Sequence, residues 1–220
     1  MKHSPSQTEL VRIQAGAVTL EGDLQIPDQA TGLVVFAHGS GSSRHSPRNR
    51  FVGHELHSVG LATLLLDLLT PEEEAVDQRT GHLRFDIELL AGRLVAATQW
   101  AAVDPATHDL AIGYFGASTG AAAALVAAAL EPERVHAVVS RGGRPDLAGE
   151  ALPLVRAPTL LIVGGQDLRV LELNRAAMAR MRAETRLEIV PGATHLFEEP
   201  GTLEVVARLA RDWFLQHLHP

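Results

Sequence analysis

The stretch that decides the fold runs from residue 110 to residue 130 and reads LAIGYFGASTGAAAALVAAAL. It begins as a short apolar run typical of a buried strand and ends as an alanine-rich segment that favours a helix. Between the two, Gly116-Ala117-Ser118-Thr119-Gly120 matches G-x-S-x-G, in the strand–turn–helix context in which nucleophilic serines occur. Glycine on both sides permits a tight turn, and the helix N-terminus places amide N–H groups beside the serine. We therefore predict that Ser118 is a nucleophile.

Short apolar runs and amphipathic stretches alternate along the rest of the chain. Continuous apolar runs suit parallel strands buried on both faces, and apolar residues three and four apart suit helices packed on them. The expected strands cover residues 8–13, 18–26, 32–37, 62–67, 110–115, 136–140, 159–163 and 186–190, and the expected helices cover 87–101, 118–130, 171–181 and 203–214, with a short one from Pro71. The first two strands suit an antiparallel hairpin. The pattern predicts an α/β fold in which helices flank one mostly parallel sheet, in a single domain over residues 1–220.

The composition excludes several classes of protein. With 220 residues, 46% of them apolar, the chain can form a full hydrophobic core, which disfavours intrinsic disorder. It has no cysteine, so disulfide scaffolds, thiolate metal sites and cysteine nucleophiles are excluded. A formal net charge of −7 argues against nucleic acid or an anionic membrane as a partner. Because no apolar run has the length of a membrane span and residues 1–6 are not an apolar leader, we expect a cytoplasmic protein.

A serine nucleophile needs a base, and the base needs a carboxylate that orients it. After an elbow of this kind the chain order is serine, acid, histidine. Asp167 and His195 each follow a short apolar run, so both fall at the carboxyl edge of the predicted sheet, where Ser118 also emerges. We predict Asp167 as the acid and His195 as the base. Asp146 and Glu150 remain alternative acids, Asp167 could instead cap the following helix, and His195 could be a surface histidine.

The oxyanion formed during attack by Ser118 needs two N–H donors. One is expected from Thr119, directly after the nucleophile, and the other from the loop His38-Gly39-Ser40-Gly41, which follows an apolar run. We predict that the backbone amides of Ser40 and Thr119 form this oxyanion hole. His38 is expected to be a structural residue that hydrogen-bonds within its loop.

Four short motifs together resemble the α/β-hydrolase fold, and specifically its small dienelactone-hydrolase-like branch. They are His38-Gly39-Ser40-Gly41, Gly116-Ala117-Ser118-Thr119-Gly120, Gly164-Gly165-Gln166-Asp167 and Gly192-Ala193-Thr194-His195. The resemblance spans about Val18 to Phe214 and implies a serine hydrolase with Ser118, Asp167 and His195 as its triad. Dienelactone hydrolase proper uses a cysteine nucleophile, so its substrate does not carry over. The chain also resembles the hydrolase half of proteins fused to a phosphoribosyltransferase domain, and its 220 residues hold no such transferase domain.

Two basic clusters leave the predicted sheet at the same edge as the motifs. They contain Arg44 and Arg48, after the loop of residues 38–41, and Arg141 and Arg144, after the strand that ends near residue 140. In an acidic protein, local positive charge suits a carboxylate or phosphate on a substrate. We predict these four arginines as substrate-binding residues. The alternative is that they pair with nearby acids or stay solvated.

The sequence favours one function and leaves others open. We predict a carboxylesterase-type serine hydrolase that cleaves small esters, anionic ones included, through an acyl-enzyme on Ser118, without a cofactor. No metal is expected, because the histidines of His54-Glu55-Leu56-His57 are three residues apart, not four as in H-E-x-x-H. Only 18 residues, 141–158, separate two expected strands, which leaves no room for a cap domain. The alternatives are a hydrolase-like binding or regulatory module without turnover, and a thioester or amide hydrolase. The expected partner is a small-molecule ester, and the oligomeric state is not predicted.

Overall fold

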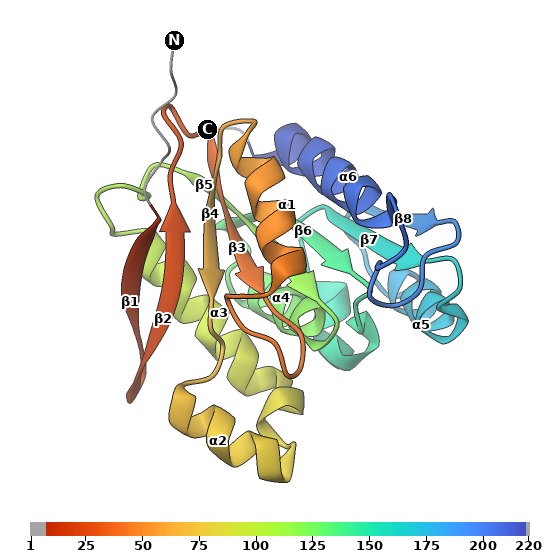
Figure 1. Ribbon diagram of the computed structural model, residues 1–220, viewed down its shortest axis with the longest axis horizontal. Helices are drawn as coiled ribbons and strands as arrows, with labels where there is room; N and C mark the ends of the chain where they lie inside the picture. The colour runs from red at the N-terminus through yellow and green to blue at the C-terminus, as the bar shows by residue number, and fades with distance from the viewer. Residues whose placement is uncertain (1–7, 219–220) are drawn as a thin grey trace.

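The computed structural model describes residues 8–218, and eight strands form the centre of the fold. They are β1 (Glu9–Ala15), β2 (Val18–Gln25), β3 (Gly32–Ala37), β4 (Leu61–Leu66), β5 (Ala111–Ala117), β6 (Val135–Arg141), β7 (Thr159–Gly164) and β8 (Thr185–Val190). All eight lie in one sheet in the order β1-β2-β4-β3-β5-β6-β7-β8 (Figure 1). The polar start at residues 1–6, from which no leader was expected, lies outside the described residues.

The pairing of the strands confirms a mostly parallel sheet with an antiparallel edge. β2 runs antiparallel to both of its neighbours, β1 and β4, and every other adjacent pair is parallel. The parallel strands β3, β4 and β5 are buried along their whole length, because helices cover both faces of the sheet. Their carboxyl ends therefore meet at one edge, where loops can combine side chains from distant parts of the chain.

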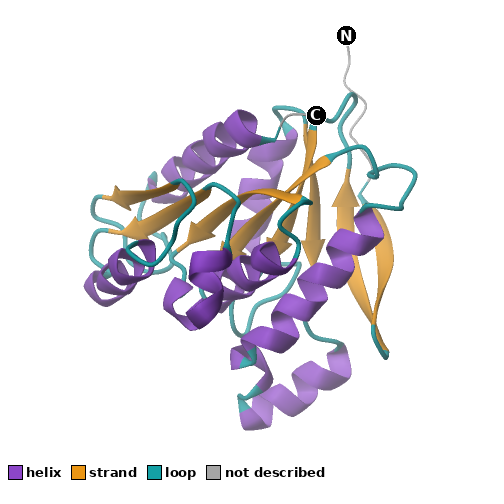
Figure 2. Cartoon of the chain, turned by 180° about the vertical axis from the view of Figure 1, so that it is seen from behind, coloured by secondary structure: helices purple, strands orange, loops and turns teal. Residues whose placement is uncertain are grey.

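Helices cover both faces of the sheet. They are α1 (Pro47–His57), α2 (Pro71–Thr80), α3 (Ile87–Ala101), α4 (Thr119–Leu130), α5 (Leu168–Met178) and α6 (Thr202–His217), with 3₁₀ segments η1 (Leu83–Phe85) and η2 (Pro145–Leu154). Helices α1 and α6 pack together on one face, and α3, α4 and α5 lie on the other (Figures 1 and 2). No helix among residues 8–218 is long and apolar enough to cross a membrane.

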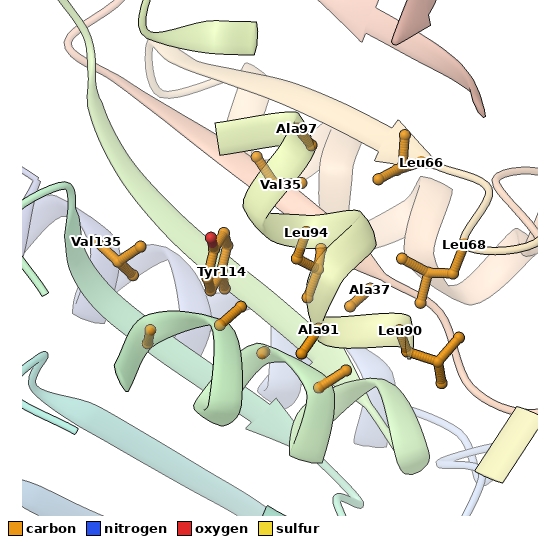
Figure 3. Close-up of a cluster of buried hydrophobic side chains, with 14 of the residues drawn as sticks. Val35, Ala37, Leu66, Leu68, Leu90, Ala91, Leu94, Ala97, Tyr114 and Val135 are labelled. Carbon is orange, nitrogen blue, oxygen red and sulfur yellow. The ribbon is translucent and has the colours of Figure 1, made fainter. Parts of the chain in front are cut away.

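The larger hydrophobic core lies between the sheet and helices α3 and α4. Leu90 and Leu94 of α3 belong to this core together with Val35 and Tyr114 of the central strands (Figure 3). Helix α4 consists mostly of alanine, and nine of its residues are buried. Small side chains allow this helix to approach β5 closely, so its first residue is fixed directly behind the end of that strand.

The predicted elements lie within a few residues of the observed ones, with one omission. Helix α1 was not predicted, because its sequence is mainly polar. Its start is nevertheless encoded: Ser46 is the N-cap, its hydroxyl accepts from the amide of Asn49, and Pro47 is the first helical residue. Between β6 and β7 the chain forms only the 3₁₀ segment η2, kinked at Gly149, and no cap domain is present in the described part of the chain.

Candidate active site

Ser118 occupies a strained turn between β5 and α4. Its backbone has φ 51° and ψ −120°, a conformation that a non-glycine residue rarely adopts. The turn requires glycine on both sides. A Cβ at Gly120 would lie 2.3 Å from the carbonyl oxygen of Ala37, and one at Gly116 would lie 2.4 Å from the Cα of Ala121. The predicted elbow is therefore present, and it holds Ser118 beyond the carboxyl end of β5.

Backbone hydrogen bonds from the end of β6 support this turn on both sides. The amide of Ser118 donates to the carbonyl of Arg141 over 3.3 Å, and the amide of Arg144 donates to the carbonyl of Ser118 over 3.1 Å. The loop between Arg141 and Arg144 is in turn held by Asn174 of α5. This residue is fully buried, and its Nδ2 donates to the carbonyl of Gly143 over 3.0 Å. No pattern in the sequence predicts this contact of Asn174, since the segment that forms α5 was expected only to pack as an amphipathic helix.

His195 and Asp167 meet at the edge of the sheet, as predicted from their positions. Nδ1 of His195 lies 2.7 Å from Oδ2 of Asp167. A carboxylate can only accept, so Nδ1 is the donor, and in a neutral imidazole of this tautomer Nε2 keeps a free lone pair. Asp167 is the residue before α5, but its side chain makes no capping hydrogen bond to that helix. The helix-cap alternative for Asp167 is therefore not what the structure shows.

The alternative acids are engaged elsewhere. Both carboxylate oxygens of Asp146 accept from Arg144, each over 2.8 Å. Glu150 accepts from Arg180 over 2.9 Å, at the exposed surface. Neither residue is hydrogen-bonded to His195, so of the three candidate acids Asp167 is the one in contact with the histidine.

The loop after β3 packs directly against Ser118. A Cβ at Gly39 would lie 3.1 Å from the Cβ of Ser118, and the hydroxyls of Ser40 and Thr119 are 3.1 Å apart. The contact between the hydroxyls keeps Ser40 and Thr119 side by side, and these are the two residues whose amides were predicted to form the oxyanion hole. Thr119 is the first residue of α4, where amide groups have no acceptor within the helix.

His38 is buried and fixes this loop. Its Nε2 accepts from the amide of Leu68 over 3.1 Å, and its Nδ1 is 2.9 Å from the carbonyl of Gly39. An amide can only donate, so the imidazole is neutral, with its proton on Nδ1. Burial lowers the pKa of His38, and the Gly39 carbonyl and the charges of Asp67 and Glu74 oppose this only in part. The expected structural role of His38 agrees with these contacts.

The lowered pKa of His38 predicts a loss of stability in mild acid. Because the unfolded state, with a histidine pKa of about 6.5, binds the proton more readily, the free energy of unfolding should fall as pH drops below that value. In His38→Gln, this fall between about pH 7 and 5 should be smaller, and at pH 7 the variant should lose about 1–3 kcal/mol with the Leu68 hydrogen bond. Urea denaturation at both pH values measures this. An unchanged pH dependence in the variant would contradict it.

A pocket of about 220 Å³ joins these groups. Its lining residues are Gly39, Ser40, Ser42, Ser46, Arg48, Asn49, Ala117, Ser118, Arg141, His195 and Leu196. Ser118, Ser40 and His195 thus share one cavity, with Asp167 behind the histidine. The sequence analysis missed Asn49, because it lies on the unpredicted helix α1. The described residues contain no cluster of three or more His, Cys, Asp or Glu that could hold a metal ion.

The structure divides the four predicted arginines into two pairs. Arg48 and Arg141 line the pocket. Arg44 instead binds three carboxylates, and Arg144 pairs with an aspartate on its own loop. The acids on Arg44 are Glu21, Asp23 and Asp67, and the acid on Arg144 is Asp146. Neither of these two lines the pocket, and their guanidinium groups are already neutralised, as the alternative interpretation expected.

Comparison with known proteins shows which family and which solved structures the chain resembles. Residues 20–216 match the Dienelactone hydrolase family. A crystal structure of dienelactone hydrolase from Anabaena variabilis ATCC 29413 is 61% identical with a TM-score of 0.97, covering 98% of this chain and all of that one. Est1E from Butyrivibrio proteoclasticus shares only the fold, with 18% identity and a TM-score of 0.78 over 94% of this chain and 98% of its own.

A curated relative from Mycobacterium tuberculosis (strain ATCC 25618 / H37Rv), provisionally named as a phosphoribosyl transferase, is 61% identical over 97% of this chain. The alignment covers 47% of that relative, so the chain spans about half the length of the protein it matches. The name of the longer protein therefore does not by itself describe this half. The family match over residues 20–216 does: the chain belongs to the dienelactone hydrolase family.

Proposed function

We propose that the chain is a serine hydrolase of the carboxylesterase type, which cleaves small esters, anionic ones included, through an acyl-enzyme on Ser118. The observation that carries the proposal is the 2.7 Å contact between His195 and Asp167 in the same site as a strained Ser118. A histidine whose Nδ1 is fixed by a carboxylate presents Nε2 as a base, and a serine on an elbow presents its hydroxyl.

The proposed reaction follows from these roles. The Oγ of Ser118 attacks the ester carbonyl while Nε2 of His195 takes the hydroxyl proton. The negative charge that forms on the carbonyl oxygen is stabilised by the amides of Ser40 and Thr119. His195 then gives its proton to the departing alkoxide, and an acyl-enzyme remains. Water, deprotonated by His195, attacks this ester and releases the acid with Ser118 restored.

Turnover separates this proposal from a binding module that keeps the elbow. With p-nitrophenyl acetate in excess, the proposal expects release of many p-nitrophenol molecules per chain at a steady rate. Ser118→Ala is the matched control for spontaneous hydrolysis. Release of no more than one equivalent would support a module without useful turnover. A much higher kcat/KM for a matched thioester or amide would move the proposal to that substrate class.

The absence of a cap among residues 8–218 predicts a preference for short acyl chains. In a pocket of about 220 Å³ without a lid, added methylenes stay in water and gain little of the ~0.8 kcal/mol that burying each one gives. The value of kcat/KM should therefore be highest for acetate to butyrate esters and show no jump above the micelle concentration. A series of p-nitrophenyl esters from acetate to palmitate measures this, and a preference for long chains would contradict it.

A further inference from the structure

Arg141 is a buried cation, and no carboxylate among residues 8–218 forms an ion pair with it. It is 8% exposed, and its Nε and Nη1 have no hydrogen-bond partner. By contrast Arg93, which is equally buried, binds the carboxylate of Glu73 and the carbonyl of Ala15. Burial, and then the charge of Arg48, lowers the pKa of Arg141 to about 10, so it remains positive at neutral pH. An uncompensated buried charge is costly, and a charged group whose pKa is shifted by burial in a cleft is a candidate for a functional site.

The surroundings of Arg141 are short of negative charge and of hydrogen-bond partners. None of the residues lining the pocket is Asp or Glu. Two other lining residues also have a buried side-chain atom without a partner, Nε of Arg48 and Oδ1 of Asn49. Arg48 contacts an acid only at its outer end, where Nη1 lies 3.3 Å from the exposed Glu198. The pocket therefore presents two cationic groups and one amide, with no acid facing them.

Helix α1 adds to this positive potential. Its N-cap Ser46 and its residues Arg48 and Asn49 line the pocket, so the helix N-terminus is turned toward the cavity. The N-terminus of a helix carries partial positive charge and favours anions. Two arginines from different elements and a helix end therefore converge on one small space.

The same space is adjacent to Ser118. Arg141 ends β6 directly opposite Ala117, and its carbonyl accepts from the amide of Ser118. Because Ser118 and Arg141 also line the same pocket, a small molecule whose ester carbonyl reaches Ser118 lies beside Arg141. We propose that Arg141, with Arg48 beside it, forms a subsite for an anionic oxygen group, a carboxylate or a phosphate, carried by the substrate of the Ser118 site. That the anion belongs to a substrate rests on the proposed esterase function, whereas the binding of an anion is inferred from the pocket alone.

Direct binding tests the subsite without requiring turnover. The probes are sodium acetate and sodium phosphate, each compared with sodium chloride at equal ionic strength, and the readout is the melting temperature of the Ser118→Ala protein. At least one probe should raise the melting temperature, and Arg141→Gln in the same background should abolish the rise. Arg50→Gln is the matched control, since this exposed arginine of α1 pairs with Asp23 outside the pocket. No rise with either probe, or a rise that survives Arg141→Gln, would overturn the proposal.

Matched esters then test whether the anion belongs to a substrate and which anion it is. One pair is p-nitrophenyl butyrate and p-nitrophenyl hemisuccinate, which adds a carboxylate. The other is 1-acetylglycerol and its 3-phosphate. In at least one pair the charged ester should have the higher kcat/KM, and Arg141→Gln should lower that value by roughly 30-fold or more, as for removal of one partner of a buried charge pair. The neutral ester should change by less than about threefold, within the small effects of substitutions that remove no contact.

The outcomes separate the subsite from a structural role of Arg141. Equal losses on both members of each pair would mean that Arg141 supports the fold or the elbow, and would overturn the proposal. Equal kcat/KM for charged and neutral esters in the wild type would overturn it as well. If the wild type hydrolyses none of the four esters, the esterase proposal fails, and the melting experiment still decides whether an anion binds at Arg141.

Discussion

Replacing Ser118 with alanine is expected to lower kcat for ester hydrolysis by at least ~10⁴-fold, as for the loss of a nucleophile from a catalytic triad. The reason is that no other hydroxyl in the pocket combines the elbow geometry with a neighbouring histidine oriented by a carboxylate. The fold should be unchanged, because alanine is no larger than serine and, like serine, carries a single Cβ at this positive φ. Initial rates with p-nitrophenyl acetate, together with a melting curve, measure both quantities.

The result that would contradict this prediction is near-normal turnover by well-folded Ser118→Ala protein. Ser40, Ser42 and Ser46 also line the pocket and would be the next candidates. Ser42→Ala is a suitable control, because Ser42 lines the same cavity and has no assigned role. It should retain activity within a few-fold of the wild type.

Asp167→Asn is expected to lower kcat by about 10⁴-fold, the loss seen when the orienting aspartate of a triad becomes an amide. An asparagine can donate to Nδ1 of His195, which then carries its proton on Nε2 and has no lone pair for the proton of Ser118. Asp146→Asn is the matched control, since that carboxylate binds Arg144 and not His195. Steady-state kinetics of the two variants check this. An inactive Asp146→Asn beside an active Asp167→Asn would move the acid to the loop after β6.

The meeting of Ser118, Asp167 and His195 was predictable because it follows from local patterns and one rule of topology. The elbow motif placed Ser118 at the end of a strand, and the apolar runs before Asp167 and His195 placed those residues at strand ends too. Parallel strands have their carboxyl ends on one edge, so three distant residues had to meet there. The 2.7 Å contact between Asp167 and His195 follows from that arrangement.

The roles of the arginines were not predictable in the same way. Arg44 is neutralised by Glu21 and Asp23 only because β2 lies next to β4 in the sheet, a pairing that the local sequence around Arg44 does not encode. Only a short turn separates Arg141 from Arg144 along the chain. Arg141 nevertheless lines a pocket without acids, whereas Arg144 pairs with Asp146. Which charges remain unpaired depends on the packed structure.

Helix α1 was missed for a related reason. Among its buried residues are Asn49 and Gly53 beside Val52 and Leu56, so the apolar periodicity that identifies a helix is weak. The cap at Ser46 and the proline after it were the available signals. Without this helix, neither Asn49 nor the orientation of Arg48 toward the pocket could be inferred.

Covalent labelling with a fluorophosphonate tests the central claim most directly, because the reagent reacts with a serine only when that serine is activated as a nucleophile. Intact mass measurement should show one label per chain, and peptide mapping should place it on Ser118. Labelling should vanish in Ser118→Ala and slow strongly in His195→Gln, in which no base takes the proton of the serine. A folded wild-type protein that takes no label, or a label that persists in Ser118→Ala, would contradict the account.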